Sequence, residues 1–205
     1  MTGGAAASGG EGRRPAVFLD RDGVLNEAEV RDGKPFPPGS PDDVVVIPGM
    51  AEACDRLGRA GLVRVVVTNQ PDVARGRQSM TGVAAINSVL RHQVDVDAVY
   101  VCPHDNDDGC ACRKPKPGLL LSAAADLSLD LSRSFMVGDR WSDIAAGREA
   151  GCRTVYIDRG YREKQADRPD HVVSDPVAAV EWILVSMQEE GGNAGSTSLR
   201  HQDLR

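Results

Sequence analysis

The chain has 205 residues, of which 41% are hydrophobic and 26% are charged, and its formal net charge is −6. A chain of this size can bury one hydrophobic core, so we expect a single globular domain. The acidic balance and an aromatic content of 4% argue against a nucleic-acid surface, which needs basic patches or stacking rings. No apolar run approaches the roughly 20 residues of a membrane helix, and no secretory signal is apparent. We therefore expect a cytoplasmic protein without a membrane partner.

Apolar runs alternate with amphipathic stretches between two polar or glycine-rich ends. The ends predict disordered tails at 1–14 and 189–205, which leaves a folded domain at 15–188. Strands are predicted at 16–20, 62–67, 98–101, 134–137, 154–157 and 172–173, and helices at 50–60, 81–92, 117–127, 142–150 and 176–187. Strands that alternate with helices indicate an α/β fold, a doubly wound parallel sheet of the Rossmann-like type.

The connections are too short to hold an additional domain. The segment 27–41 is polar and rich in proline, so it is predicted to be a loop. Little sequence separates Asn26 from the second strand, and no extra domain fits between Thr68 and the cysteine-rich segment 102–112. We therefore expect no large cap domain, and we expect substrate specificity to come from the loops at 27–41, 71–78 and 102–112.

Two aspartates follow the first apolar run. Asp20 and Asp22 are two positions apart, so their side chains can share one side of the strand end. Gly23 allows the chain to turn away sharply. Two close carboxylates repel each other unless a cation or a shared proton intervenes. The alternative, a strand followed by an ordinary acidic turn, would not explain the presence of the second carboxylate or of Asn26.

Other polar residues follow other predicted strands. Thr68 ends the second strand, Lys114 follows the third, and Asp139 ends the fourth. In doubly wound sheets, ligands bind beyond the carboxyl ends of the strands. These residues can therefore converge with Asp20, although they are far apart in the sequence.

The segment 102–112 has the composition of a metal loop. It supplies three thiols and one imidazole: Cys102, His104, Cys110 and Cys112. Four such donors in a short loop match a closed tetrahedral zinc site, which has a structural role because no position is left for a substrate. The alternative is a set of reduced cysteines packed in a loop. A zinc ion here would stiffen the chain just before Arg113 and Lys114.

Four segments resemble, in order, the motifs of the haloacid dehalogenase (HAD) superfamily of phosphotransferases. They are Phe18–Asn26, Val65–Gln70, Cys112–Gly118 and Val137–Arg140. The resemblance runs from about Arg13 to Met187 and is closest to subfamily IIIA, the branch of heptose bisphosphate phosphatases and histidinol phosphatases.

The resemblance implies a phosphatase that acts through an aspartyl phosphate. Asp20 would be the nucleophile, and Asp22 the general acid and base. Mg²⁺ would bind Asp20, the backbone carbonyl of Asp22, and Asp139. Thr68 and Lys114 would stabilise the transferring phosphoryl group. Asp143, one helical turn beyond Asp139, either supports Asp139 or contacts the metal.

Seven residues are predicted to contact the substrate or to order the loops around it: Arg21, Asn26, Asn69, Gln70, Arg75, Arg113 and Arg140. Arg113 is predicted to grip a second phosphate with its planar guanidinium. Arg75 is predicted either to bind a distal phosphate or to form a surface salt bridge. Arg140 stands where the heptose branch often has lysine.

These residues support three hypotheses for the substrate. The leading one is removal of one phosphate from D-glycero-D-manno-heptose 1,7-bisphosphate, because Arg75 and Arg113 suit a second phosphate. Histidinol phosphate is the alternative, on the spacing of the zinc loop; its ammonium would need acidic groups such as Asp72 or Glu27. A third, different hypothesis is a zinc-loop module that binds nucleic acid through Arg113, Lys114 and Lys116. We expect a small phosphorylated sugar as partner, no nucleic acid, and a monomer.

Overall fold

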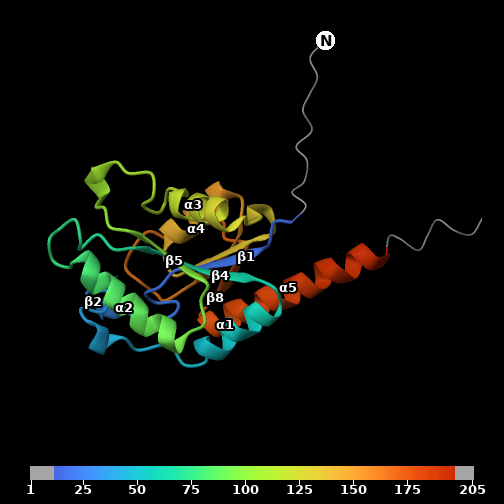
Figure 1. Cartoon of the computed structure of the whole chain (residues 1–205), viewed down its shortest axis with the longest axis horizontal. Helices are drawn as coiled ribbons and strands as arrows, with labels where there is room; N and C mark the ends of the chain where they lie inside the picture. Colours follow the sequence, from blue (N-terminus) through green and yellow to red (C-terminus); the bar gives the residue numbers. More distant parts are fainter. Residues whose placement is uncertain (1–11, 197–205) are drawn as a thin grey trace, which may run out of the picture.

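A computed structural model describes residues 12–196 of the chain (Figure 1). The rest of the predicted tails, at 1–11 and 197–205, lies outside the described residues. The centre of the fold is strand β1 (Ala16–Leu19), in which every residue is buried. A strand that is covered on both faces must be apolar throughout, which explains the unbroken apolar run.

Six parallel strands form the sheet in the order β5-β4-β1-β6-β7-β8. The other strands are β4 (Val63–Asn69), β5 (Ala98–Cys102), β6 (Phe135–Gly138), β7 (Arg153–Ile157) and β8 (His171–Val173). The chain builds the sheet outward from β1 through β4 to β5, and then returns to place β6 on the other side of β1. The strand order therefore reverses between β1 and β6, where doubly wound folds bind their ligands.

Helices cover both faces of the sheet (Figure 1). Helices α3 (Gly118–Leu127) and α4 (Trp141–Ala150) lie on one face, and α1 (Met50–Arg59), α2 (Met80–Gln93) and α5 (Pro176–Ser196) lie on the other. Side chains of β1 alternate between two cores: Val17 and Leu19 pack with α1 and α5, and Phe18 packs with α3 and α4. No helix within residues 12–196 is long and apolar enough to span a membrane.

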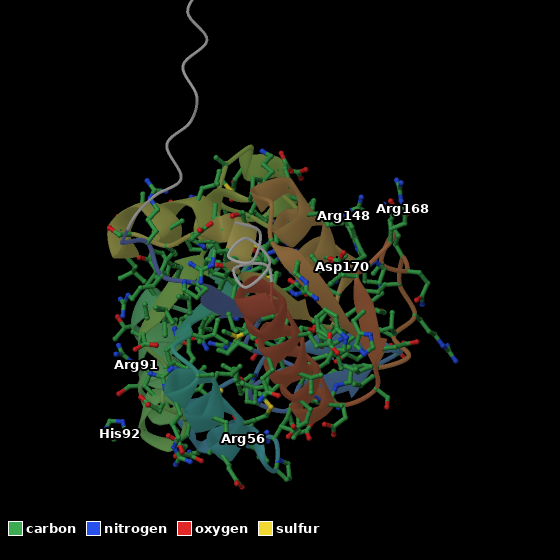
Figure 2. All side chains as sticks on the ribbon, turned by 90° about the vertical axis from the view of Figure 1, so that its right-hand side faces the viewer. Arg56, Arg91, His92, Arg148, Arg168 and Asp170 are labelled. Atoms are coloured by element: carbon green, nitrogen blue, oxygen red, sulfur yellow. The ribbon has the colours of Figure 1, made fainter. Side chains whose placement is uncertain are left out.

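Polar contacts tie the outer helices and loops to this framework. Arg56 of α1, labelled at the lower edge of Figure 2, forms an ion pair with Glu181 of α5. Asp170, on the opposite side of α5 in the same view, accepts hydrogen bonds of 2.7 and 2.8 Å from the backbone and hydroxyl groups of Thr154 in β7. Asp175 caps α5 by accepting from the backbone N–H of Val177 at 2.7 Å.

The predicted fold class is confirmed: a doubly wound parallel sheet with helices on both faces and, within residues 12–196, no large cap domain. The predicted strands and helices agree with the observed ones to within two residues at almost every end. Gly151 ends α4 in a left-handed conformation with φ of 84°, as its position after the helix predicts.

The prediction of a loop at 27–41 is wrong in one respect. The segment contains an antiparallel hairpin, β2 (Glu29–Arg31) and β3 (Lys34–Phe36). Its turn is Asp32-Gly33, with φ of 51° and 74°. Asp-Gly is a preferred pair for the two-residue turn of a hairpin, which requires positive φ at both positions. The prolines of this segment favoured the prediction of a loop, so the Asp-Gly pair was not recognised as a hairpin turn.

Regular structure also extends into both predicted tails. Helix α5 continues to Ser196, past its predicted end at Met187, so residues 189–196 are helical rather than loose. Gln188 and Glu189 are good helix formers, and lengthening an existing helix avoids the cost of nucleation. At the other end, Arg14 forms a β-bridge with Leu129.

We predict that Gly147→Ala destabilises the protein, although alanine is normally the better helix residue. A Cβ at position 147 would lie 2.6 Å from the Cβ of Met136 and 2.9 Å from the Cγ2 of Thr154, so α4 would have to move off the sheet. We expect urea unfolding to show a loss of about 1–3 kcal/mol. Gly82→Ala in α2 is the control, because its new Cβ meets the far end of the flexible Gln78 side chain, which can move aside, whereas the Cβ of Met136 is fixed to the sheet. Equal stability of the Gly147 variant and the wild type would contradict this packing.

Candidate active site

A cleft of about 730 Å³ opens at the carboxyl end of the sheet. Its floor contains Asp20 after β1, Thr68 of β4, and Lys114 from the segment between β5 and α3. The hairpin β2–β3 contributes Lys34, Pro35 and Phe36 to one wall. The predicted residues from different strand ends therefore meet in one cavity, at the switch in strand order between β1 and β6.

The side chain of Lys114 holds the floor of the cleft together. Its Nζ lies 2.8 Å from Oδ1 of Asp20, 2.6 Å from Oδ1 of Asp143, and 2.7 Å from the carbonyl oxygen of Val67. The residue is only 3% exposed. Burial alone would lower the pKa of this ammonium, but the charges of Asp143 and Asp20 outweigh it and raise the pKa to about 12. Lys114 is therefore a buried, permanent cation.

Three buried carboxylates surround this point. One oxygen each of Asp20, Asp139 and Asp143 lies within 4.8 Å of the others. Burial raises the pKa of Asp20 to about 6, against the lowering effect of Lys114. Burial and the charge of Asp20 also raise the pKa of Asp139 well above its ordinary range.

The carboxylates leave an acceptor for a cation. Oδ1 of Asp139 is buried and has no hydrogen-bond partner among the described residues. A buried carboxylate oxygen without a partner is costly, and hard oxygen ligands of this kind suit Mg²⁺. Asp143 also accepts from the backbone N–H of Arg140 at 3.0 Å, which caps α4. The cluster could therefore hold a divalent cation, with Asp143 both supporting the helix end and facing the cluster.

The carboxylate of Asp22 is held by several donors. Arg21 donates to both of its oxygens at 3.0 Å, Asn26 donates to Oδ1 at 3.0 Å, and Gln70 donates to Oδ2 at 2.9 Å. Arg21 is itself anchored to Asn87 of α2 at 2.8 Å. These donors fix the direction of the Asp22 carboxyl group.

Three of the seven residues predicted to contact the substrate or to order the loops lie behind the cleft. Arg21, Asn26 and Gln70 are buried and do not line the cleft. They serve Asp22 instead, and Gln70 also donates to Oγ1 of Thr68 at 2.9 Å. The sequence gives their distance along the chain from Asp22 but not the direction of their side chains.

Asn69 lines the cleft and also braces the backbone of Lys114. Its Nδ2 donates to the carbonyl oxygen of Lys114 at 3.0 Å, and its Oδ1 accepts from the N–H of Lys114 at 3.1 Å. This pair of hydrogen bonds fixes a loop residue to the end of β4. The backbone of Lys114 is therefore positioned by β4, a strand that is remote from it in the sequence.

The predicted cations of the outer cleft differ in how far they are neutralised. Arg75 pairs with Asp105 at 2.6 Å and with Asp72 at 3.4 Å, and Arg140 pairs with Glu163 at 3.0 Å. Arg113 donates instead to neutral oxygens, the side chain of Asn106 at 2.9 Å and the carbonyl of His104 at 3.0 Å. All three arginines line the cleft, but the charge of Arg113 is the least compensated.

The metal-loop residues gather as predicted. One donor atom each of Cys102, His104, Cys110 and Cys112 lies within 4.8 Å of the others. The Nδ1 of His104 is 3.3 Å from the Sγ of Cys112, which is 3.2 Å from the Sγ of Cys102. Four donors around one point could hold a metal ion. The bond from Arg113 to the carbonyl of His104 joins this loop to the cleft.

Several residues at the site were not predicted from the sequence. They lie in the segment after β7 and in the hairpin: Arg159, Tyr161, Glu163 and Lys34. Tyr161 donates its hydroxyl to Oδ2 of Asp139 at 2.8 Å. The available signal was the position of 158–163, directly after a predicted strand, where the other site residues also lie.

Comparisons with known proteins agree with this architecture. The HAD-hydrolase-like family model matches residues 111–179. A D-glycero-D-manno-heptose-1,7-bisphosphate 7-phosphatase of Thermosynechococcus vestitus is 39% identical over an alignment of 197 residues, and the match covers 85% of this chain and 97% of the relative. The corresponding Pseudomonas aeruginosa protein, named for the beta anomer, is 35% identical over an alignment of 180 residues, and the match covers 84% of this chain and 98% of the relative.

A solved structure is similar over the same range. It is the D,D-heptose 1,7-bisphosphate phosphatase of B. bronchiseptica, complexed with magnesium and phosphate. It is 33% identical to this chain, has a TM-score of 0.68, and the match covers 84% of this chain and 99% of that one. The chain belongs to the family of HAD-like phosphatases that contains these enzymes. The resemblance drawn from the four motif segments is thus confirmed, and the chain is an enzyme, a phosphatase.

We predict that Asp20→Asn stabilises the protein in magnesium-free buffer, and more so as the pH rises. The folded protein holds a proton on Asp20 up to a pKa of about 6, against an ordinary value of 3.8. Between these values folding takes up a proton, so stability falls as the pH rises. A shift of this size corresponds to about 3 kcal/mol. Urea unfolding at about pH 4 and about pH 7 should show the advantage of the variant growing toward that value. A difference that does not change with pH would contradict the burial of this charge.

Proposed function

We propose that this chain is a magnesium-dependent phosphomonoesterase whose substrate is D-glycero-D-manno-heptose 1,7-bisphosphate. Two relatives are named for that substrate, and this chain matches them over nearly their whole length. The observation that carries the proposal is that one cleft contains two features. The Asp20–Lys114 ion pair is buried at its floor. Arg113, whose hydrogen-bond partners are neutral, lies in its outer part.

In the first half of the reaction, an oxygen of Asp20 attacks phosphorus. The bond between phosphorus and the sugar oxygen breaks, and Asp22 in its protonated form delivers a proton to the leaving oxygen. Lys114 offsets the charge on the transferring group, and Thr68 donates its hydroxyl to a phosphoryl oxygen. In the second half, water attacks phosphorus, its proton passes to Asp22, and the bond to Asp20 breaks. This releases phosphate and restores the carboxylate.

The carboxylates of Asp20, Asp139 and Asp143, together with the backbone carbonyl of Asp22, would hold the magnesium ion. The bound ion supplies positive charge that reduces repulsion between the attacking carboxylate and the phosphate dianion. The unpartnered Oδ1 of Asp139 supports this assignment. The donors around Asp22 fix the direction of its carboxyl group, which gives up a proton in the first half of the reaction and takes one up in the second.

The second phosphate of a bisphosphate would bind at Arg113, with Lys34 of the hairpin as a second cation at the cleft wall. A guanidinium can bind a phosphate through two parallel hydrogen bonds. Arg75 is a weaker candidate, because Asp105 and Asp72 already offset its charge. The same holds for Arg140, which Glu163 engages.

The two other hypotheses receive less support. The ammonium of histidinol phosphate needs a free carboxylate, but Asp72 is paired with Arg75 and Glu27 does not line the cleft. Glu163, which does line it, is paired with Arg140. A nucleic-acid surface built on Arg113, Lys114 and Lys116 lacks its central member, because Lys114 is buried against Asp20. A phosphorylated sugar therefore remains the best match.

We further propose that the loop 102–112 binds one structural zinc ion, with Cys102, His104, Cys110 and Cys112 as the four ligands. Three sulfur donors and one imidazole favour zinc over harder cations. Because Arg113 is bonded to the carbonyl of His104, the ion would fix the cation that receives the second phosphate. A site rich in thiolates fits the reducing cytoplasm, the compartment predicted from the sequence.

The substrate assignment predicts a preference that depends on Arg113. We expect kcat/KM for heptose 1,7-bisphosphate to exceed the value for heptose 7-phosphate, which lacks the second anion. Arg113→Met should lower the value for the bisphosphate by roughly 30- to 100-fold, as expected for the loss of a charged hydrogen-bonded contact of about 2–3 kcal/mol, and should change the monophosphate little.

Two controls accompany this measurement. Arg75→Met, which alters a neutralised arginine at the same cleft, should have the smaller effect. Asp20→Asn should leave no turnover on either compound. A preference for histidinol phosphate, or an equal loss on both heptose phosphates in the Arg113 variant, would refute the proposed substrate.

The zinc assignment predicts about one zinc ion per chain in protein purified without added metal. Cys110→Ser should reduce the zinc content and lower the melting temperature, because structural zinc contributes on the order of 10 kcal/mol to folding. Cys54→Ala is the matched control, since Cys54 lies on the buried face of α1, in the core. This variant should keep its zinc. Elemental analysis that finds no zinc in a fully active enzyme would remove the proposal.

A further inference from the structure

The segment between β7 and β8 contacts both aspartate motifs of the site. Arg159 donates to the carbonyl oxygen of Gly23 through Nη2 at 2.8 Å and Nε at 3.2 Å. Tyr161 donates to Oδ2 of Asp139 at 2.8 Å, and Glu163 accepts from Arg140 at 3.0 Å. Residues 159–163 thus bind the turn after β1 and the residues after β6 at the same time.

We propose that Tyr161 is a positioning residue that orients Asp139 toward the magnesium ion. Its hydroxyl occupies Oδ2, while Oδ1 of the same carboxylate is buried without a hydrogen-bond partner among the described residues. The hydrogen bond to one oxygen limits the rotation of the carboxylate. The other oxygen, which accepts no hydrogen bond, is then the one atom available as a metal ligand. This inference rests on the proposed magnesium site and adds a residue to it.

The surroundings leave little room for another arrangement. Tyr161 is only 8% exposed, so water competes poorly for its hydroxyl. Gly23 has a φ of 86°, and a Cβ there would lie 1.8 Å from Oδ2 of Asp139 and 3.0 Å from the hydroxyl of Tyr161. The hydrogen bond between Tyr161 and Asp139 therefore occupies the space that a side chain at position 23 would fill.

Donors that hold a metal ligand from behind commonly set the affinity of a metal site. Loss of such a donor typically costs 10- to 100-fold in metal affinity or activity, because the ligand can then rotate away from the ion. The ring of Tyr161 also fills space, so its removal would confuse packing with orientation. Replacement by phenylalanine keeps the ring and removes only the hydroxyl.

The test compares Tyr161→Phe with Tyr156→Phe. Tyr156, in β7, is also buried, and no hydrogen bond joins its hydroxyl to any of the described residues, so its loss should change nothing at the site. Isothermal titration calorimetry without substrate gives the dissociation constant for Mg²⁺. We expect it to rise by about 10- to 100-fold in Tyr161→Phe and to stay at the wild-type value in Tyr156→Phe.

Two further readouts separate orientation from folding. The far-UV circular dichroism of Tyr161→Phe without magnesium should match the wild type, and its kcat at saturating magnesium should recover to within a few fold. Wild-type magnesium affinity in Tyr161→Phe, or an equal loss in both variants, would overturn the positioning role. If the wild type itself does not bind magnesium, the proposed function fails rather than this inference alone.

Discussion

The buried contact between Lys114 and two aspartates is the constraint on which the site depends. Its ammonium lies within 2.8 Å of both Asp20 and Asp143, deep enough that water can do little to solvate any of the three. Buried charges are tolerated only when they are paired. Asp20, Asp139 and Asp143 together carry three negative charges when ionised, and Lys114 offsets one of them. The remaining excess of two matches the charge of one magnesium ion.

The fold explains how such a cluster can exist. Asp20, Asp139 and Asp143 follow the two strands, β1 and β6, between which the strand order reverses, and Lys114 reaches them from the far side of β4. A fully buried β1 fixes Asp20, the proposed nucleophile, while the donors on Asp22 fix the proposed acid and base beside it. The outer cleft is made of a hairpin and loops, so specificity can change without disturbing the centre.

Much of this was predictable from the sequence because the signals are local. An apolar run followed by Asp20 and Asp22 gives a strand and its end, and the alternation of strands and helices gives the sheet. Direction and pairing are not local. Nothing near Arg75 in the sequence indicates that Asp105, thirty residues later, neutralises it, and Arg21 is turned away from the cleft by Asn87 of α2. The proposed role of Tyr161 depends on the absence of a side chain at Gly23, and only the fold brings Gly23 close to Tyr161.

The most direct test of the account is to locate the phosphoryl group during turnover. The reaction would be quenched in acid, the acyl phosphate reduced with borohydride, and the protein digested for mass spectrometry. The account predicts that the aspartate at position 20 is converted to homoserine, in amounts that require both substrate and magnesium. Turnover without any modification at Asp20, or with the modification at another carboxylate, would contradict it.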